Sequence, residues 1–418
     1  MLQGVNQNPM REGARPAPTI ENGEQYLEPY FKSLEEIEEH NFNKILNAFI
    51  DLKVSPEHFS WVTGYGHDDY GRKKLDELFA KVFNTESAIV RPHFVSGTHA
   101  ISCVFFGLLR PHDELVSIAG EPYDTLHEVI GIKEKSGSLT DLGIKYKEIP
   151  LKNNFEVDID VIPSYISKKT KMVFIQRSKG YHYRKSLTIS DIERIISLIK
   201  KIDKNIICFV DNCFGEFTEK LEPTDVGADI ICGSLIKNIG GGIVPAGGYI
   251  AGKKELVELS CEKLTAPGIG SKGGSMFDLN RLIFQGLFFA PHITCQALKS
   301  ISLAGYIFEK QGFEVNPKWD EIKTDIVVAI KLGEKELVEK ICKTVQANSP
   351  ISSHLTPIPC RLPGYEDEVI MAGGTFIEGS TIELSCDAPM REPYILYFQG
   401  GLNYFHAKTV LKKLFLAE

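Results

Sequence analysis

The sequence lacks several features that would indicate other classes of protein. No stretch approaches 18 consecutive apolar residues, so we expect no membrane-spanning helix. The N-terminal residues Met1–Glu24 are polar and contain no apolar core segment, so we expect a flexible arm and not a signal peptide. The nine cysteines form no Cys-x-x-Cys pair and the eleven histidines show no His-Glu-x-x-His spacing. We therefore predict no metal site.

Basic residues are not in excess. The 418-residue chain has 47 Lys and Arg against 55 Asp and Glu, a formal net charge of -8, which argues against a nucleic-acid-binding surface. Its content of 43% hydrophobic and 24% charged residues is ordinary for a soluble globular protein. Several cysteines lie within apolar runs, among them Cys103, Cys208 and Cys232. This distribution favours reduced thiols in a cytoplasmic protein over disulfides.

Short apolar segments alternate with helical patterns over much of the chain. Helices are predicted at 34–52, 75–83, 98–109, 124–134 and 189–202. Strands are predicted at 87–91, 114–119, 145–149, 172–176, 206–211, 229–234 and 247–251. Strands that are apolar on both faces and alternate with helices indicate an α/β fold, with a mainly parallel seven-stranded sheet flanked by helices.

The pattern changes after about residue 300. Strands are predicted at 306–315, 326–331 and 382–385, and helices at 334–347 and 405–415. This order indicates a smaller α+β domain. We therefore expect an N-terminal arm and helix at 1–58, a large domain at 59–300 and a small C-terminal domain at 301–418.

Two predicted strands end near side chains of opposite charge. The strand at 206–211 ends at Asp211, and Lys237 follows the strand at 229–234 in a segment that continues into three glycines. Because ligands bind at the carboxyl ends of parallel strands, we expect the two residues to share one edge of the sheet. Alternatively, Asp211 begins a turn and Lys237 lies at the surface. The apolar sequence before Lys237 favours a pocket, where a lysine can act as nucleophile and base.

An anion-binding loop is predicted where the helix at 98–109 begins. Gly97 allows close approach of the backbone, Ser96 and Thr98 supply hydroxyls, and a helix N-terminus attracts negative charge. A plain helix cap is the alternative. Tyr123 follows the next strand, where it could stack on a planar ring or be structural. Ser234, three residues before Lys237, could also contact a phosphate.

These residues together match the requirements of pyridoxal 5'-phosphate, which needs a lysine for its aldehyde, an acid for its ring nitrogen and an anion cradle. The order Ser-Gly-Thr, Tyr, Asp and Ser-x-x-Lys resembles fold-type I pyridoxal-phosphate enzymes of the aminotransferase superfamily. The separation is 26 residues both from Gly97 to Tyr123 and from Asp211 to Lys237, similar to cystathionine lyases and methionine γ-lyases. Segments at 64–69, 91–100, 209–216, 233–238 and 265–270 resemble the methionine γ-lyase-like and cystathionine β-lyase-like proteins linked to aluminium resistance.

The resemblance implies a role for each site residue. Lys237 would form the internal aldimine and act in catalysis, and Asp211 would pair with the ring nitrogen. Tyr123 would stack on the ring and is the second catalytic candidate. The phosphate would be held by Ser96, Gly97, Thr98 and Ser234.

One departure from the lyases concerns the neighbouring subunit. In the lyases a Tyr-x-Arg element reaches the phosphate of the adjacent subunit. Here Tyr65 occupies the corresponding region, but His67 stands in the arginine position and the nearest arginine is Arg72. This departure puts the cross-subunit phosphate contact in question, and Tyr65 is kept as a substrate-site candidate.

A substrate carboxylate is normally bound by arginine, whose planar guanidinium gives two parallel hydrogen bonds. The lyases place this residue in the C-terminal domain, and Arg391 is the first candidate there, with Arg361 second. The alternative for either is a surface ion pair. Arg177 and Arg184 follow a predicted strand end and could also face the pocket.

The resemblance implies a carbon–sulfur lyase that acts on a sulfur-containing amino acid. Lys237 would remove the α-proton, and β- or γ-elimination would release a keto acid, ammonia and a thiol. Two alternatives stay open: another pyridoxal-phosphate reaction, such as amino transfer or racemisation, and a non-catalytic cofactor-binding stress protein. The family also implies a cytoplasmic homodimer or homotetramer with active sites at subunit interfaces, a small amino-acid substrate, and no nucleic-acid or membrane partner.

Overall fold

The computed structural model describes residues 20–415. Most of the arm expected at Met1–Glu24 lies outside these residues, and its last five residues begin helix α1 (Ile20–Asp51). The chain divides into two compact units, Ile37–His292 and Met1–Glu36 with Ile293–Glu418. The boundaries fall inside α1 and α8 (Asn280–Lys310). A continuous helix shows no change of pattern at such a boundary, and the boundaries expected from the sequence lie near residues 58 and 300.

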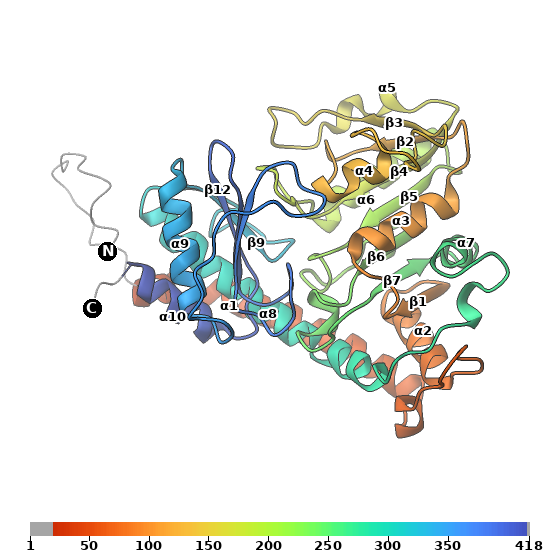
Figure 1. Ribbon diagram of the computed structural model, residues 1–418, viewed down its shortest axis with the longest axis horizontal. Coiled ribbons are helices and arrows are strands. Elements are labelled where there is room, and N and C mark those ends of the chain that lie inside the picture. Colours follow the sequence, from red (N-terminus) through yellow and green to blue (C-terminus); the bar gives the residue numbers. More distant parts are fainter. Residues whose placement is uncertain (1–19, 416–418) are drawn as a thin grey trace. The chain divides into compact units, whose positions relative to one another are not determined.

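The larger unit contains a seven-stranded sheet (Figure 1). Its order is β1 (Ser87–Arg91), β7 (Gly248–Gly252), β6 (Ile230–Ser234), β5 (Ile207–Asp211), β4 (Thr170–Gln176), β2 (Glu114–Ser117) and β3 (Lys145–Glu148). Strand β7 is antiparallel to both of its neighbours, and the other neighbouring pairs are parallel. The carboxyl ends of the six remaining strands therefore lie at one edge. The predicted α/β fold with a mainly parallel seven-stranded sheet is confirmed.

Both faces of this sheet are covered by helices. Alternate residues of β4 enter different core clusters: Val173 and Ile175 enter the first, and Met172 and Phe174 enter the second. Helices α2 (Tyr70–Val82) and α6 (Ile189–Ile202) contribute to the first cluster, and α3 (Gly97–Leu108) and α7 (Lys254–Leu264) contribute to the second. Because both faces are buried, residues 172–175 of β4 and 207–210 of β5 are apolar in succession and do not alternate with polar residues.

Most predicted elements of the larger unit are confirmed within a few residues, and β1 and α6 have the predicted bounds. The helix predicted at 124–134 is shorter, consisting of the 3-10 turn η2 (Asp124–Leu126) and α4 (His127–Ile130). It ends at Gly131, whose φ of 92° is in the left-handed region. The remaining short helices are α5 (Ile162–Tyr165), η1 (Pro56–Phe59), η3 (Ile159–Val161), η4 (Pro223–Val226), η5 (Asn238–Gly240) and η6 (Gly270–Lys272).

The smaller unit contains a five-stranded sheet whose neighbouring strands are all antiparallel. Its order is β10 (Val369–Ala372), β11 (Ser385–Pro389), β12 (Ile395–Gln399), β9 (Val327–Lys331) and β8 (Glu314–Asn316). Helix α9 (Lys335–Ala347) packs on this sheet, where Sγ of Cys342 lies 3.9 Å from the carbonyl oxygen of Cys386. Helix α10 (Tyr404–Phe415) contacts α9. The smaller unit therefore contains both the sheet and the helices expected of a small α+β domain.

Two strand predictions in this unit are wrong. Residues 306–310 continue α8, which ends before Gly312 (φ 94°), and β8 begins only at Glu314. A short apolar run does not distinguish a buried strand from a buried helix. The strand predicted at 382–385 overlaps β11 only at Ser385. Residues 382–384 lie outside the strand, and the carboxylate of Glu383 accepts hydrogen bonds from the N–H groups of Phe376 and Ile377, both at 2.9 Å. The sequence also did not predict β10, β12, α5, α7 or the helix α8.

All nine cysteines lie in the described part of the chain as free thiols, and of these only Cys360 is exposed. Among the helices of residues 20–415, none is long and apolar enough to cross a membrane. Within the same residues, no group of three or more His, Cys, Asp or Glu side chains could hold a metal ion.

Candidate active site

The loop after β1 enters α3 through Ser96, which is the N-cap residue of this 12-residue helix. Its Oγ accepts a hydrogen bond from the N–H group of His99 at 3.1 Å. The helix cap considered as an alternative is therefore present. It satisfies only one of the free N–H groups at the helix N-terminus, and those of Gly97 and Thr98 have no partner within the helix. These two groups can bind an anion.

Gly97 lies where three loops meet. A Cβ atom on Gly97 would be 3.0 Å from Sγ of Cys213 and 3.8 Å from Cβ of Ser234. Cys213 follows β5, and Ser234 ends β6. The loop after β2 also reaches this point, since Oγ1 of Thr98 lies 2.6 Å from Oγ1 of Thr125. The candidate phosphate residues are thus brought together at the carboxyl edge of the sheet.

Asp211 is the last residue of β5 and is 8% exposed. Burial raises the pKa of its carboxyl group. The N–H group of Cys213, which donates to Oδ1 at 3.1 Å, and the positive charges of Lys237 and Arg184 oppose that shift. Burial disfavours the ionised form of this carboxyl group, and a nearby positive charge favours it. The group is therefore suited to bind a protonated ring nitrogen.

Lys237 is half-buried and immediately precedes the turn η5. Its Nζ lies 4.0 Å from the centroid of the Phe214 ring. Within residues 20–415 the amine makes no hydrogen bond and no ion pair. No carboxylate or carbonyl oxygen therefore has to be displaced before the amine reacts with an aldehyde.

Tyr123 and Arg184 are positioned by the segment that follows β4. The N–H group of Tyr123 donates to Oε1 of Gln176 at 2.8 Å, and its ring centroid lies 5.5 Å from that of Tyr181. Nη2 of the buried Arg184 donates to the carbonyl oxygens of Gln176 and Ser178 at 2.9 and 2.6 Å. Arg184 therefore stabilises this segment. Its proposed contact with substrate remains a prediction.

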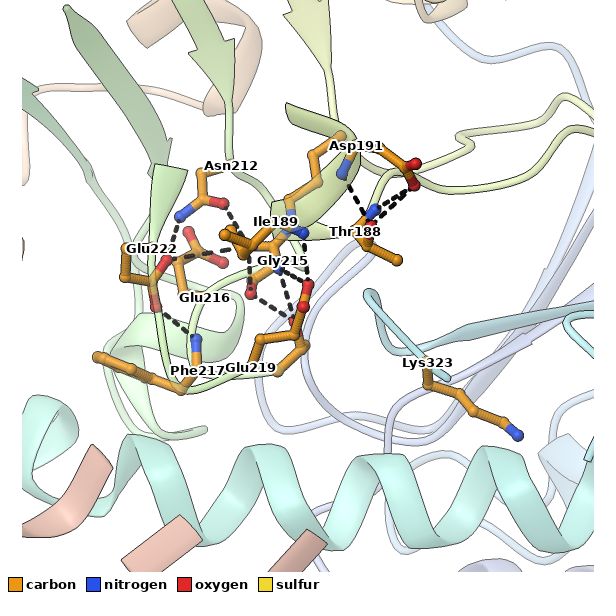
Figure 2. A network of polar contacts seen from close by, with 12 residues as sticks. Thr188, Ile189, Asp191, Asn212, Gly215, Glu216, Phe217, Glu219, Glu222 and Lys323 are labelled. Atoms are coloured by element: carbon orange, nitrogen blue, oxygen red, sulfur yellow. Dashed lines mark hydrogen bonds and ion pairs between the residues drawn. The ribbon is translucent and has the colours of Figure 1, made fainter. Parts of the chain in front are cut away.

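Arg177 does not face a ligand, so the idea that it lines the pocket is wrong. Its guanidinium is fully buried and donates to Oδ1 of Asn212 and the carbonyl oxygen of Gly215, at 2.9 and 2.8 Å. It also binds Oε1 of Glu219 at 2.9 Å. Oε2 of Glu222 lies 3.8 Å from Nη1 of Arg177. The same carboxylate accepts a hydrogen bond from Nδ2 of Asn212 at 2.9 Å (Figure 2). Arg177 thus fixes the chain that follows Asp211.

Glu216 is a buried acid that the sequence analysis did not identify. Its Oε1 accepts a hydrogen bond from the Tyr249 hydroxyl at 3.0 Å, and its Oε2 has no partner among the described residues. Burial raises the pKa of Glu216 to about 8, and the neighbouring carboxyl groups of Glu222 and Asp211 add to the shift. In the sequence Glu216 lies between Phe214 and Phe217. These apolar neighbours were the sequence feature that could have indicated a buried acid.

Replacing Glu216 with glutamine should change how stability depends on pH. The folded protein keeps the Glu216 proton to a higher pH than the unfolded chain, so this residue's contribution is greatest below about pH 4.5 and is lost as pH rises to about 8. Over that range the wild type should lose up to about 5 kcal/mol relative to Glu216→Gln. Urea denaturation at pH 5, 6.5 and 8 measures the difference.

The slope against pH is the relevant quantity, because an unpaired amide at position 216 also lowers stability at every pH. Glu193→Gln, which removes an exposed carboxylate of α6, is the matched control. Parallel pH profiles of Glu216→Gln and wild type would show that Glu216 ionises normally in the folded protein.

The segment around Tyr65 is exposed. The Tyr65 side chain is 83% exposed, and its ring lies 5.7 Å from that of His67. Arg72 is directed inward, where Nη1 donates to the carbonyl oxygens of Gly66 and Gly274, both at 2.6 Å. Arg72 therefore holds this segment in place and is not available as a substitute for the missing arginine. A substrate contact by Tyr65 remains a prediction.

The candidate carboxylate-binding arginines lie in the smaller unit. Arg391 follows β11, and its Nη1 lies 2.9 Å from Oδ2 of Asp367, with both side chains partly exposed. Arg361 is exposed. The ion pair considered as the alternative for Arg391 is thus present, and the assignment of either arginine to substrate remains a prediction.

Known proteins similar to this chain point to one family. The family model described as methionine gamma-lyase matches residues 17–417. A solved structure from Clostridium novyi NT, a carbon–sulfur lyase involved in aluminum resistance, is 50% identical, covers 94% of both chains and has a TM-score of 0.90. The "uncharacterized protein YnbB" of Bacillus subtilis is 48% identical over 383 residues, 91% of each chain. Cystathionine gamma-lyase from yeast, 20% identical with a TM-score of 0.56, covers 82% of this chain and 86% of its own and shows the fold alone.

Proposed function

The chain belongs to the methionine gamma-lyase family, and from that premise we propose that it is a pyridoxal 5'-phosphate-dependent carbon–sulfur lyase acting on a sulfur-containing amino acid. Members of this family depend on pyridoxal phosphate in general, and the similar protein from Clostridium novyi NT is a carbon–sulfur lyase. One observation carries the proposal: the N-terminus of α3, a buried aspartate and a lysine without polar partners among the described residues lie on loops at one edge of the sheet.

The residues present fit this cofactor. The N–H groups of Gly97 and Thr98 and the hydroxyl group of Ser234 would hold its phosphate. The carboxylate of Asp211 would bind its ring nitrogen, and Lys237 would bind its aldehyde. Tyr123 and the hydroxyl group of Ser96 complete the proposed set. A Cβ atom at position 97 would fill the space beside Cys213. Glycine leaves this space open next to the proposed phosphate position.

When bound, pyridoxal phosphate withdraws electrons from the α-carbon of an amino acid. Asp211 keeps a negative charge next to the ring nitrogen in a buried place, where that charge acts strongly. Nζ of Lys237 takes the α-proton as general base. The carbon–sulfur bond then breaks, the sulfur leaves with a proton as a thiol, and hydrolysis by one water gives the keto acid and ammonia.

An amino-acid screen tests the proposal. The purified protein, supplied with pyridoxal phosphate, is incubated separately with L-cystathionine, L-methionine and L-cysteine. Keto acid is measured together with the released thiol or, for L-cysteine, with hydrogen sulfide. A lyase releases the two in equal amounts. Transfer of the amino group to an added keto acid without thiol release would indicate an aminotransferase. Loss of optical rotation alone would indicate a racemase, and cofactor binding without turnover a binding protein.

Gly97→Ala should weaken cofactor binding about tenfold or more, because its methyl group meets the Cys213 sulfur and crowds the phosphate loop. The measurement is a titration of cofactor-free protein with pyridoxal phosphate, followed by visible absorbance. The double variant Gly97→Ala, Cys213→Ala should recover part of the affinity, since it removes the sulfur. Equal affinity of wild type and Gly97→Ala would place the phosphate elsewhere.

We also propose a cytoplasmic homodimer or homotetramer whose active sites form at subunit interfaces. Several large apolar side chains of the larger unit are exposed, among them Tyr65, Tyr70, Val95 and Phe277 at 83, 75, 85 and 58%. Exposed apolar side chains of this size are candidates for burial between subunits. Nine free thiols suit a reducing compartment. Light scattering coupled to gel filtration measures the assembly, and a monomer would contradict it.

A further inference from the structure

We propose that Phe214 is a positioning residue that holds the side-chain amine of Lys237 whenever the amine carries a proton. The 4.0 Å between Nζ and the ring centroid is well inside the distance of about 6 Å at which a ring face attracts a cation. Because the amine has no hydrogen bond or ion pair within the described residues, the ring is the group on which it rests. The inference rests on the proposed function in one respect, namely that this amine binds the cofactor.

The backbone of Phe214 is fixed in a conformation that phenylalanine rarely adopts. Its φ of 68° is in the left-handed region, which costs a residue with a side chain about 1 kcal/mol or more. Such a conformation persists only where the surroundings determine it. Here the side-chain amide of Asn238 donates to the carbonyl oxygens of Phe214 and Glu216, at 2.9 and 3.0 Å. Since Asn238 follows Lys237 directly, one segment carries the lysine and fixes the ring.

The opposite side of the Phe214 loop is fixed by buried polar groups. Glu222 accepts a hydrogen bond from the N–H group of Phe217 at 2.9 Å (Figure 2). The Arg177 side chain crosses Gly215 so closely that a Cβ atom there would lie 2.5 Å from its Cδ. The loop is therefore rigid on both sides of Phe214.

Asp211 and Phe214 lie three residues apart on this loop, and both act on Lys237. The carboxylate of Asp211 attracts the ammonium form through its charge. An ammonium group drawn onto that carboxylate would occupy the place proposed for the ring nitrogen. The Phe214 ring offers a second attraction without a hydrogen bond, and so keeps the amine near the reacting carbon.

A ring face attracts an ammonium group but has little attraction for a neutral amine. The proposed reaction needs both forms, because the neutral amine takes the α-proton and the protonated amine can give it to the leaving sulfur. Phe214 would therefore retain the amine in the interval when it carries that proton. Removing the ring should leave the fold intact and take away the contact that holds the amine, so that Lys237 reacts more readily.

The test compares three replacements of Phe214 in the cofactor-free full-length protein. Phe214→Leu removes the ring, 3,5-difluorophenylalanine keeps its shape but weakens the attraction of its face, and Phe214→Tyr keeps both. The rate of acetylation of Lys237 at pH 7 is followed by mass spectrometry, with the exposed Lys171 as internal reference. Lys237 should react about 3- to 30-fold faster in Phe214→Leu, faster by a smaller factor with the fluorinated ring, and as in wild type with tyrosine.

An unchanged rate with the fluorinated ring would overturn the inference even if Phe214→Leu folds poorly, because the two rings have nearly the same shape. A parallel titration of wild type with pyridoxal phosphate distinguishes failure of this inference from failure of the proposed function. A visible absorbance band together with an unchanged acetylation rate refutes the role of Phe214 alone. No band in wild type refutes the cofactor assignment, whatever the acetylation rate.

Discussion

Lys237→Ala should lose the visible absorbance band of bound pyridoxal phosphate and should release keto acid at least about a thousandfold more slowly than wild type. The side chain has two proposed tasks, to bind the aldehyde and to remove the α-proton, and alanine can perform neither. Its amine has no other polar partner within residues 20–415, so the substitution breaks no hydrogen bond or ion pair. Absorbance spectra and a keto acid assay at saturating cofactor measure the two effects.

Lys171→Ala is the matched control for this variant, because Lys171 is exposed on β4 and forms no ion pair within the described residues. Added methylamine should restore part of the turnover of Lys237→Ala by supplying a free base, but should not alter Lys171→Ala. Full activity in Lys237→Ala would show that the reaction does not pass through this lysine.

Asp211→Asn should reduce turnover about a hundredfold or more while the cofactor still binds. Asparagine has nearly the same shape but no charge, so it cannot stabilise a proton on the ring nitrogen. In the absence of the cofactor, burial raises the pKa of Asp211, and the positive charge of Lys237 opposes this. A positively charged ring nitrogen adds a further partner that favours the ionised carboxylate.

The measurements for Asp211→Asn are kcat, KM and the dissociation constant of pyridoxal phosphate. We expect kcat and kcat/KM to fall together, since the interaction strengthens as charge develops on the cofactor. Asp160→Asn, which changes an exposed aspartate of the same unit, should leave all three values as in wild type. Unchanged kcat in Asp211→Asn would remove this residue from the proposed ring-nitrogen position.

The placement of the site could be predicted from the sequence because strand order and direction follow from general rules. Parallel strands bring their carboxyl ends to one edge. The structure places Asp211 at the end of β5, and Ser234 lies near Gly97. The helix N-cap at Ser96 was likewise visible as a Ser-Gly-Thr sequence before a helical pattern.

Side-chain direction could not be predicted from the sequence. Arg177 and Arg184 follow the same strand, yet Arg177 crosses Gly215 and enters a buried network that stabilises the chain after Asp211. The left-handed backbone of Phe214 was also not predictable, because it depends on the amide of Asn238, 24 residues further along the chain. Both features arise from tertiary contacts that local sequence patterns do not record.

The long helix α8 was missed for a different reason. No helix was predicted at 280–310, and the apolar run at 303–308, which has the composition of a strand, forms the last turns of α8. Its six residues are also too few to show a helical period clearly. Only the left-handed Gly312 marks the end of the helix.

The central claim is that Lys237 carries pyridoxal 5'-phosphate, and reduction with borohydride followed by peptide mass spectrometry tests it most directly. Reduction fixes the cofactor to whichever amine holds it, and digestion locates the modified peptide. We predict one pyridoxyl group per chain, on Lys237, and none in Lys237→Ala. A pyridoxyl group on another lysine of the wild type, or no modified peptide after loading with the cofactor, would contradict the claim.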